Sequence, residues 1–275
     1  MKNPLRDRRA GVLLHPTSLP GPHGCGNFGQ DARRFIDFLQ SAGISVWQML
    51  PLGPTHADGS PYQCLSVHAG NTGLICLDDL VGAGWLSPAL AASASEQDCL
   101  LEAKAGFDAT ATPDQHKAYA AFKDTHAFWL NAYALYQAIR QSQDNRPWYE
   151  WPAALRNWQQ AVSVEADHTA AAEQVRFEQY LFFSQWSELH RYAKTHGVAL
   201  FGDMPIYVAH DSADVWANPE LFTVNNAGLP ETVAGVPPDY FSETGQRWGN
   251  PLYRWDILEQ QDFGWWVERF KTQLE

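Results

Sequence analysis

Positive charge is scarce in this 275-residue sequence. Its 31 Asp and Glu residues outnumber 19 Lys and Arg residues, which gives a formal net charge of −12. Proteins that bind nucleic acid or anionic membranes concentrate Lys and Arg to neutralise phosphate groups. The charge balance therefore argues against both as partners.

Long apolar runs are missing as well. No window approaches the roughly 18 uninterrupted apolar residues of a membrane span. The apolar run that follows the N-terminal charges, 12–14, is too short for the core of a secretory signal peptide. We therefore expect a soluble chain that is not secreted by that route.

Cysteine is rare, and its placement is uninformative for disulfides. The four cysteines form no C-x-x-C pair and are too few for a disulfide scaffold. Reduced thiols in a reducing compartment are the simpler interpretation, so we predict a cytoplasmic protein. The four are Cys25, Cys64, Cys76 and Cys99.

What the sequence does contain is aromatic side chains. It has 12 Trp, 10 Tyr and 14 Phe, whereas only 18% of its residues are charged, below the ~25% typical of soluble domains. With 45% hydrophobic residues the chain can bury a sizeable core. The surplus of rings indicates large buried faces, aromatic platforms for a ligand, or both.

Two distant stretches repeat one design, in which an amphipathic helix ends at a glycine and an apolar run follows at once. A glycine in this position supplies the left-handed backbone that ends many helices. The apolar runs line up glycine for glycine and proline for proline, and each predicts a strand. The copies consist of Phe35, Phe38, Leu39, Ala42, Gly43 and 44–51, and of Phe182, Trp186, Leu189, Ala193, Gly197 and 198–205.

These units predict an α/β fold. Strands that are apolar on both faces and are reached through helices are typical of parallel sheets covered by helices. An earlier strand at 12–15 raises the expected number of parallel strands to about three. Three strands cannot close a barrel by themselves.

The stretch from Trp85 to about Gln174 is Ala-rich and predicts a helical insertion. Ser87 followed by Pro88 is a typical helix start. Further helices are expected from one stripe through Phe122, His126, Trp129, Tyr133 and Tyr136, and from a last helix with Phe263, Trp266, Phe270 and Leu274 on one face.

Motifs of other chemistries are weak or missing. Residues 24–29 match G-x-G-x-x-G, but a loop with three prolines separates them from the strand, and Met49 stands where a ribose-binding acid is wanted. A nicotinamide-dependent dehydrogenase is therefore a minor alternative. No H-E-x-x-H and no G-x-S-x-G occurs, so neither a zinc site nor a serine hydrolase is indicated, and no cofactor or metal is expected.

Three polar segments follow the predicted strands, at the edge where α/β barrels place their chemistry. Asp203 in one of them is as consistent with capping backbone amides as with function, and Tyr62 alone would more often be structural. Rings and carboxylates together on long loops favour a carbohydrate ligand, because aromatic faces pack on the apolar faces of sugars. The segments are 59–63, 202–207 with Asp211 and Asp214, and 235–242.

The sequence resembles the 4-α-glucanotransferases, or amylomaltases, of the α-amylase superfamily. The resemblance runs through most of the chain and is loose only in the helical insertion. It is carried by the segments at 11–20 (GVLLHPTSLP), 47–55 (WQMLPLGPT), 60–63 (SPYQ), 202–208 (GDMPIYV), 211–216 (DSADVW), 235–242 (GVPPDYFS) and 246–251 (QRWGNP).

The resemblance implies a (β/α)8 barrel of the TIM type. This chain would supply about its first three β/α units and a helical insertion. The implied domains are a first part of the barrel at 1–85, a mostly helical subdomain at 86–174, and a continuation with a substrate-covering loop at 175–275.

The implied reaction is the retaining transfer of α-1,4-glucan segments between maltooligosaccharides. Such chemistry uses two carboxyl groups about 5 Å apart. The resemblance places the nucleophile, in an Arg-x-Asp motif on the fourth strand, and the acid/base downstream of residue 275. The 275 residues alone are accordingly expected to be inactive, and a non-catalytic α-glucan-binding protein is the alternative.

The resemblance assigns binding roles within this chain. Asp203 corresponds to a carboxylate that supports the sugar beside the scissile bond, and Tyr62 to a tyrosine that lines the substrate groove. Asp239 and Phe241 match a loop that covers bound glucan, and Trp248 matches an aromatic position just beyond it. No catalytic residue is assigned within the chain.

Overall fold

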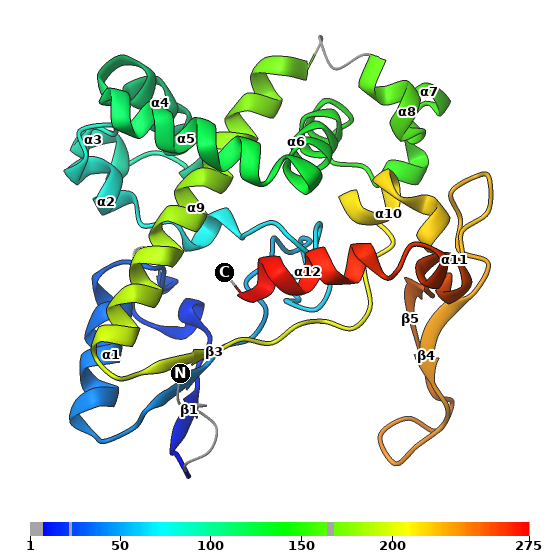
Figure 1. Cartoon of the computed structure of the whole chain (residues 1–275), viewed down its shortest axis with the longest axis horizontal. Coiled ribbons are helices and arrows are strands. Elements are labelled where there is room, and N and C mark those ends of the chain that lie inside the picture. The colour runs from blue at the N-terminus through cyan, green and yellow to red at the C-terminus, as the bar shows by residue number, and fades with distance from the viewer. Residues whose placement is uncertain (1–7, 22–23, 164–167, 275) are drawn as a thin grey trace. The chain divides into compact units, whose positions relative to one another are not determined.

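The computed structural model describes residues 8–21, 24–163 and 168–274. The chain forms two compact units, each assembled from three separate stretches (Figure 1). Unit 1 comprises 1–52, 70–122 and 177–204, and unit 2 comprises 53–69, 123–176 and 205–275. This division by contact differs from the three domains expected from the sequence, whose boundaries stay a prediction.

Unit 1 contains a parallel sheet in the order β1 (Gly11–Leu13), β2 (Val46–Gln48) and β3 (Ala199–Phe201), which confirms the three predicted parallel strands. Val46 pairs with Ala199. Aligning the two glycines would pair Val46 with Leu200 instead. The register of the sheet is therefore offset by one residue from the alignment of the two sequences, because one more residue separates Gly43 from its strand.

Two helices each precede a strand of this sheet, α1 (Gln30–Ser41) before β2 and α9 (Thr169–Thr195) before β3. The two helices end in the same way. Gly43 and Gly197 have φ angles of 71° and 75°. The amide of the next residue reaches back five positions in each case, from Ile44 to the Leu39 carbonyl at 2.9 Å and from Val198 to the Ala193 carbonyl at 3.0 Å. The predicted glycine caps are confirmed.

The buried face of α1 differs from the expected stripe. Ala32, Ile36 and Leu39 are buried, whereas the Phe38 side chain is 58% exposed. Positions 32, 36 and 39 follow the helical period, and Phe38 is rotated about 100° from Leu39. In β2, the fully buried Trp47 ring donates its Nε1–H to the Leu14 carbonyl at 2.7 Å and meets the Phe35 ring of α1 edge-on.

Two buried glutamines of α9 hold the 70–76 segment in unit 1. Gln179 accepts from the Gly70 amide at 2.7 Å and donates to the Gly70 carbonyl at 3.0 Å. Gln185 makes the same two bonds with Cys76, at 2.7 and 3.0 Å. Each side chain thus pairs with a backbone N–H and C=O, as a neighbouring β-strand would.

The predicted insertion is helical throughout much of its length, and Ser87 caps α3 as expected. One correction concerns the aromatic stripe, which does not lie on a single helix. α5 ends at Thr125, and His126 is the N-cap of α6, so only Trp129, Tyr133 and Tyr136 share a helix. The helices are α2 (Leu77–Gly82), α3 (Pro88–Ala91), α4 (Glu96–Thr110), α5 (Pro113–Thr125), α6 (Ala127–Ser142), α7 (Ala153–Arg156) and α8 (Trp158–Ala161), with short 3-10 turns η1 (Pro16–Ser18), η3 (Thr72–Leu74) and η4 (Trp148–Glu150).

Unit 2 contains a hairpin that sequence patterns did not predict, formed by β4 (Val233–Val236) and β5 (Gln246–Pro251). In Figure 1 it is the orange ribbon that ends in a loop. The remaining elements are α10 (Ala213–Ala217), η6 (Pro219–Leu221), α11 (Trp255–Gln260) and α12 (Gly264–Leu274).

The last helix, α12, turns a different face inward from the one expected. Phe263, Phe270 and Leu274 are 41%, 50% and 83% exposed, whereas Arg269 and Thr272 are buried. The Arg269 guanidinium donates to the Ile206 carbonyl and the Tyr253 hydroxyl and lies over the rings of Trp265 and Trp266. The apolar stripe did not predict the buried face of α12, because the side chain buried there is the cation of Arg269.

Removing a buried glutamine should be costly. Gln179→Leu leaves the buried N–H and C=O of Gly70 without partners, at about 1–3 kcal/mol each. We expect urea unfolding to show a loss of roughly 2–5 kcal/mol, against less than about 0.5 kcal/mol for the control Ser187→Leu on the exposed side of α9. Equal losses in the two variants would contradict this assignment.

His68 should make unit 2 acid-sensitive. Burial, with the charges of Arg269 and His126, lowers the pKa of His68 from 6.5 to about 3. A base with a lowered folded-state pKa contributes stability above 6.5 that is lost as pH falls toward 3, here up to about 5 kcal/mol. Urea unfolding across this range should show a flatter profile for His68→Gln than for the parent. The same pH dependence of stability in His68→Gln and the parent would refute this role of His68.

Candidate functional site

The predicted site residues fall in both units. Asp203 lies two residues after β3, in unit 1, and its side chain is half-buried. Tyr62, Asp239, Phe241 and Trp248 belong to unit 2. The contacts that position the unit 2 residues come from the segment of Gln63, the backbone after Tyr207 and the β4–β5 hairpin.

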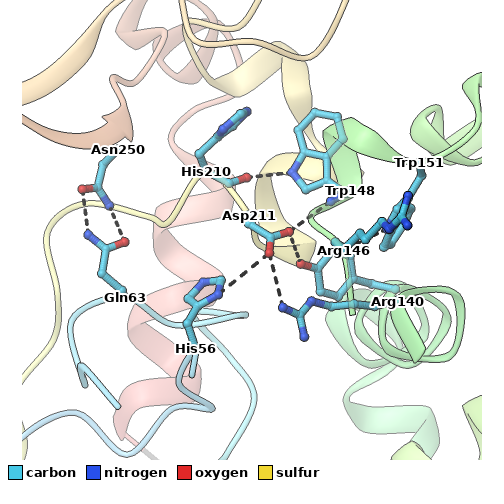
Figure 2. Close-up of polar contacts among 10 residues, drawn as sticks. His56, Gln63, Arg140, Arg146, Trp148, Trp151, His210, Asp211 and Asn250 are labelled. Carbon is cyan, nitrogen blue, oxygen red and sulfur yellow. Dashed lines mark hydrogen bonds and ion pairs between the residues drawn. The ribbon is translucent and has the colours of Figure 1, made fainter. Parts of the chain in front are cut away.

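A pair of amide side chains joins these loops. Gln63 donates to Asn250 Oδ1 at 3.0 Å, and Asn250 donates back to Gln63 Oε1 at 3.3 Å (Figure 2). Asn250 is 3% exposed and also donates to the Val208 carbonyl at 2.9 Å. One buried side chain thereby fixes the segment that carries Tyr62 to β5, which carries Trp248, and to the backbone after Tyr207.

The ring of Trp248 is held in place yet accessible. Its Nε1–H donates to Gln246 Oε1 at 3.1 Å, and its ring centroid lies 6.0 Å from that of Tyr207 at a steep angle. The side chain remains 43% exposed, and that of Tyr62 46%. Large rings exposed on ordered elements are suited to binding a ligand with apolar faces.

Asp239 shapes the loop between β4 and β5. Its Oδ1 accepts from the amides of Phe241 and Ser242 at 2.9 and 2.8 Å, and its own amide donates to the Ser242 carbonyl at 2.9 Å. The rings of Tyr240 and Phe241 are 97% and 88% exposed. The carboxylate therefore organises a turn that presents two neighbouring rings to solvent.

Asp211 is a carboxylate of unit 2 with four polar partners. One oxygen accepts from the Trp148 amide at 3.1 Å (Figure 2). The same oxygen accepts from the Tyr136 hydroxyl at 2.7 Å. The other lies 3.5 Å from Arg140 Nη2 and 3.8 Å from His56 Nδ1. The carboxylate is 13% exposed, so these contacts lie largely out of water and tie α6 to the loop after Tyr207.

Burial sets the protonation of the groups around Asp211. It lowers the pKa of His56 despite the nearby carboxylate, so the imidazole is neutral at neutral pH and Arg140 is the cation that faces Asp211. Burial also raises the pKa of Tyr136 well above 10, which keeps its hydroxyl a donor. The preceding residue, His210, has a pKa lowered by burial, and its ring stacks on that of Tyr149 with centroids 4.4 Å apart.

The letters Arg-x-Asp occur once, at Arg254–Asp256, and are not a strand-end motif. The structure places them at the start of α11, where the guanidinium makes two bonds to Asp256 at 3.0 and 2.9 Å. Both side chains are exposed. Within the described stretches, no group of three or more His, Cys, Asp or Glu side chains could hold a metal ion.

Sequence reasoning missed the residues that hold the site together. Asp211, Gln63 and Asn250 lie inside segments singled out by motif, yet no pattern indicated their partners. Gln63 and Asn250 are 187 residues apart.

Among the residues described, no helix combines the length and apolar character needed to cross a membrane.

Comparison with known proteins decides the family. The 4-alpha-glucanotransferase family matches residues 14–275. This chain belongs to that family. A 4-alpha-glucanotransferase of Thermus thermophilus is 48% identical over 98% of this chain, and one of Synechocystis is 43% identical over the same share. The dinucleotide-binding alternative raised by 24–29 is set aside.

A solved structure agrees with this assignment. An amylomaltase from Streptococcus agalactiae, in complex with acarbose, is 35% identical, covers 96% of this chain and superposes with a TM-score of 0.89. The predicted fold class, an α/β barrel type to which this chain contributes three β/α units and a helical insertion, is confirmed. The chain spans 56% and 57% of the lengths of the two relatives named above.

The turn at Asp239 can be tested directly. Asp239→Ala removes the acceptor of two amides, so we expect the order parameters of Phe241 and Ser242 to fall from about 0.85 to below about 0.6 in 15N relaxation. Asp239→Asn keeps an acceptor oxygen and should restore most of the order. Glu243→Ala, an exposed acid in the same loop, is the control. An unchanged loop in Asp239→Ala would disprove the role.

Proposed function

We propose that this chain is the glucan-binding part of a 4-α-glucanotransferase, which transfers α-1,4-glucan segments between maltooligosaccharides with retention. Membership of the family supports the reaction class. The observation that carries the proposal is the exposed rings of Tyr62, Phe241 and Trp248, which are large, uncharged and held on an ordered frame.

A neutral polysaccharide suits these residues better than a charged ligand does. A glucan has alternating hydroxyl edges and apolar faces, and indole and phenyl rings pack against the latter. The chain's net charge of −12 disfavours nucleic acid and membrane surfaces. We assign the binding surface to Tyr62, Phe241 and Trp248.

Two carboxylates receive different roles in this proposal. Asp203 follows β3, at the end of a strand where barrels place polar groups, and we assign it the support of the sugar beside the scissile bond. Asp239 instead acts through the loop, because its oxygen is engaged by the Phe241 and Ser242 amides. It is a positioning residue for the exposed rings.

Retention requires two further groups. One carboxylate attacks the anomeric carbon and forms a covalent glycosyl intermediate, while a second protonates the departing oxygen and then takes a proton from the acceptor hydroxyl. We assign neither role to any of the 275 residues. No cofactor is needed for this chemistry, since the carboxyl groups supply both the nucleophile and the proton.

We also propose the segment limits and the location. The barrel would begin at 1–85, carry a helical subdomain at 86–174, and continue at 175–275 with the loop that presents Phe241. A cytoplasmic location is supported by the four cysteines, none of which is in a disulfide.

A non-catalytic α-glucan-binding protein is the second candidate. It is favoured by the same exposed rings of Tyr62, Phe241 and Trp248, which would bind a glucan without any chemistry. Glucan binding is common to both candidates, whereas transfer belongs only to the first, so a binding measurement must be paired with an activity measurement.

Binding should depend on Trp248. We expect calorimetric titration with maltoheptaose to show binding by the 275-residue polypeptide, weakened roughly 5- to 10-fold in Trp248→Ala through loss of about 1 kcal/mol of ring packing. Phe38→Ala, which removes an exposed ring from α1, should bind like the parent. Equal affinity in both variants, or no binding by the parent, would reject the assigned surface.

The same polypeptide is expected to release no glucose from maltotriose above the rate in buffer, because its residues include no assigned carboxylate pair. Release abolished by Asp203→Asn would show that a pair does lie within the 275 residues. Transfer by the longer polypeptide would distinguish the transferase from the binding protein.

A further inference from the structure

Unit 2 contains a large cavity of about 1130 Å³ that shares no lining residue with the surface formed by Tyr62, Phe241 and Trp248. Four parts of the chain line it, namely Trp148 of η4, α7 with the start of α8, the stretch from Ala217 to Gly228, and Arg254. Its volume lies slightly above the range typical of ligand sites, about 300–1000 Å³, which suits a ligand larger than a monosaccharide.

The floor of the cavity is rigid. Gly228 has a φ of +78°, and a Cβ there would lie 2.6 Å from the Trp148 ring, so the backbone sits directly on the indole. The indole Nε1–H donates to the His210 carbonyl at 2.7 Å (Figure 2). His210 Nε2 donates in turn to the Gly228 carbonyl at 2.6 Å. The floor is therefore built in advance of any ligand.

Several polar side chains of the lining have unused hydrogen-bonding groups. Among the described residues, Arg156, Gln159 and Asn226 make no side-chain hydrogen bond or ion pair. Asn157 and Asn225 use their Oδ1 atoms to accept backbone amides, at 3.1 Å from Gln160 and at 2.9 Å from Ala227, which leaves their NH2 groups for a ligand. Amides that both donate and accept match hydroxyl groups.

The charges of the lining favour a neutral ligand. Arg254 bonds twice to Asp256, and the other two charged residues of the lining, Arg156 and Glu220, have opposite signs, so the lining has no excess of positive charge. An anionic ligand would need an excess of cations. The half-buried ring of Trp158 adds an apolar surface, which meets Trp216 edge-on at 5.1 Å.

We propose that this cavity is a second oligosaccharide-binding site, which takes an α-1,4-glucan chain through its amide side chains and the Trp158 ring. The choice of an α-1,4-glucan among neutral oligosaccharides rests on the proposed function. The rigid floor connects the cavity through His210 to Asp211, whose carboxylate accepts from the Trp148 amide. Both glucan sites are thus attached to the loop that follows Tyr207.

The test uses the 275-residue polypeptide and maltoheptaose, with the indole N–H signals followed by 1H–15N NMR and assigned by Trp→Phe variants. We expect saturable shifts of the Trp158 signal. Ala153→Trp places a bulky ring in the cavity and should weaken this response about tenfold or more. Ala154→Trp, an exposed neighbour on α7 that does not line the cavity, is the matched control and should respond like the parent.

A double variant guards against misfolding of the filled cavity. Gln159→Ala with Asn226→Ala removes two unpaired amides from exposed positions and should weaken the Trp158 response severalfold. An unchanged response in both this variant and Ala153→Trp overturns the proposal, and so does the absence of any Trp158 shift up to about 10 mM maltoheptaose.

The two proposals fail separately. In Trp248→Ala the Trp158 response should persist at the parental affinity, since the sites share no residue. A response at Trp248 with none at Trp158 overturns the second site and leaves the proposed function standing. A response at Trp158 with none at Trp248 supports the cavity and rejects the assigned surface.

Discussion

Long loops that run through a protein interior must satisfy their backbone polar groups, and this constraint governs the structure. Amide side chains meet it in both units. Gln179 and Gln185 each pair with the N–H and C=O of one residue of the 70–76 segment in unit 1, and Asn250 pairs with Gln63 and the Val208 carbonyl in unit 2. An amide both donates and accepts without charge, so it can replace a neighbouring strand where no strand is present.

Charged groups serve a second purpose in unit 2, where they join elements that do not otherwise share a sheet or a helix pair. Asp211 gathers Tyr136 and Arg140 from α6 and the Trp148 amide from η4. Arg269 of α12 donates to the Ile206 carbonyl and Tyr253. A buried charge is costly unless it is paired, which makes such arrangements geometrically exacting. The loop carrying Tyr207 is held at both ends by these groups.

Local rules predicted the elements of unit 1 well. Glycine caps and apolar runs located β2 and β3, because the left-handed residue and the strand are both set by nearby residues. Local rules failed where burial depends on distant partners. Phe38 is exposed and Arg269 is buried, although hydrophobicity favours the opposite. Likewise the motif at 235–242 identified the loop that carries Phe241. It did not predict that Asp239 accepts the amides of Phe241 and Ser242, which only the structure shows.

The pairing of Gln63 with Asn250 also has a consequence for synthesis. The two residues are 187 positions apart, so at roughly 5–20 residues per second the ribosome adds the second about 10 to 40 s after the first. During that interval the 53–69 segment has emerged without its unit 2 partners, including Val67's acceptor Asp214. Unit 2 can therefore complete its fold only late in synthesis. Until the β4–β5 hairpin has been made, the 53–69 segment must be kept from associating with other chains.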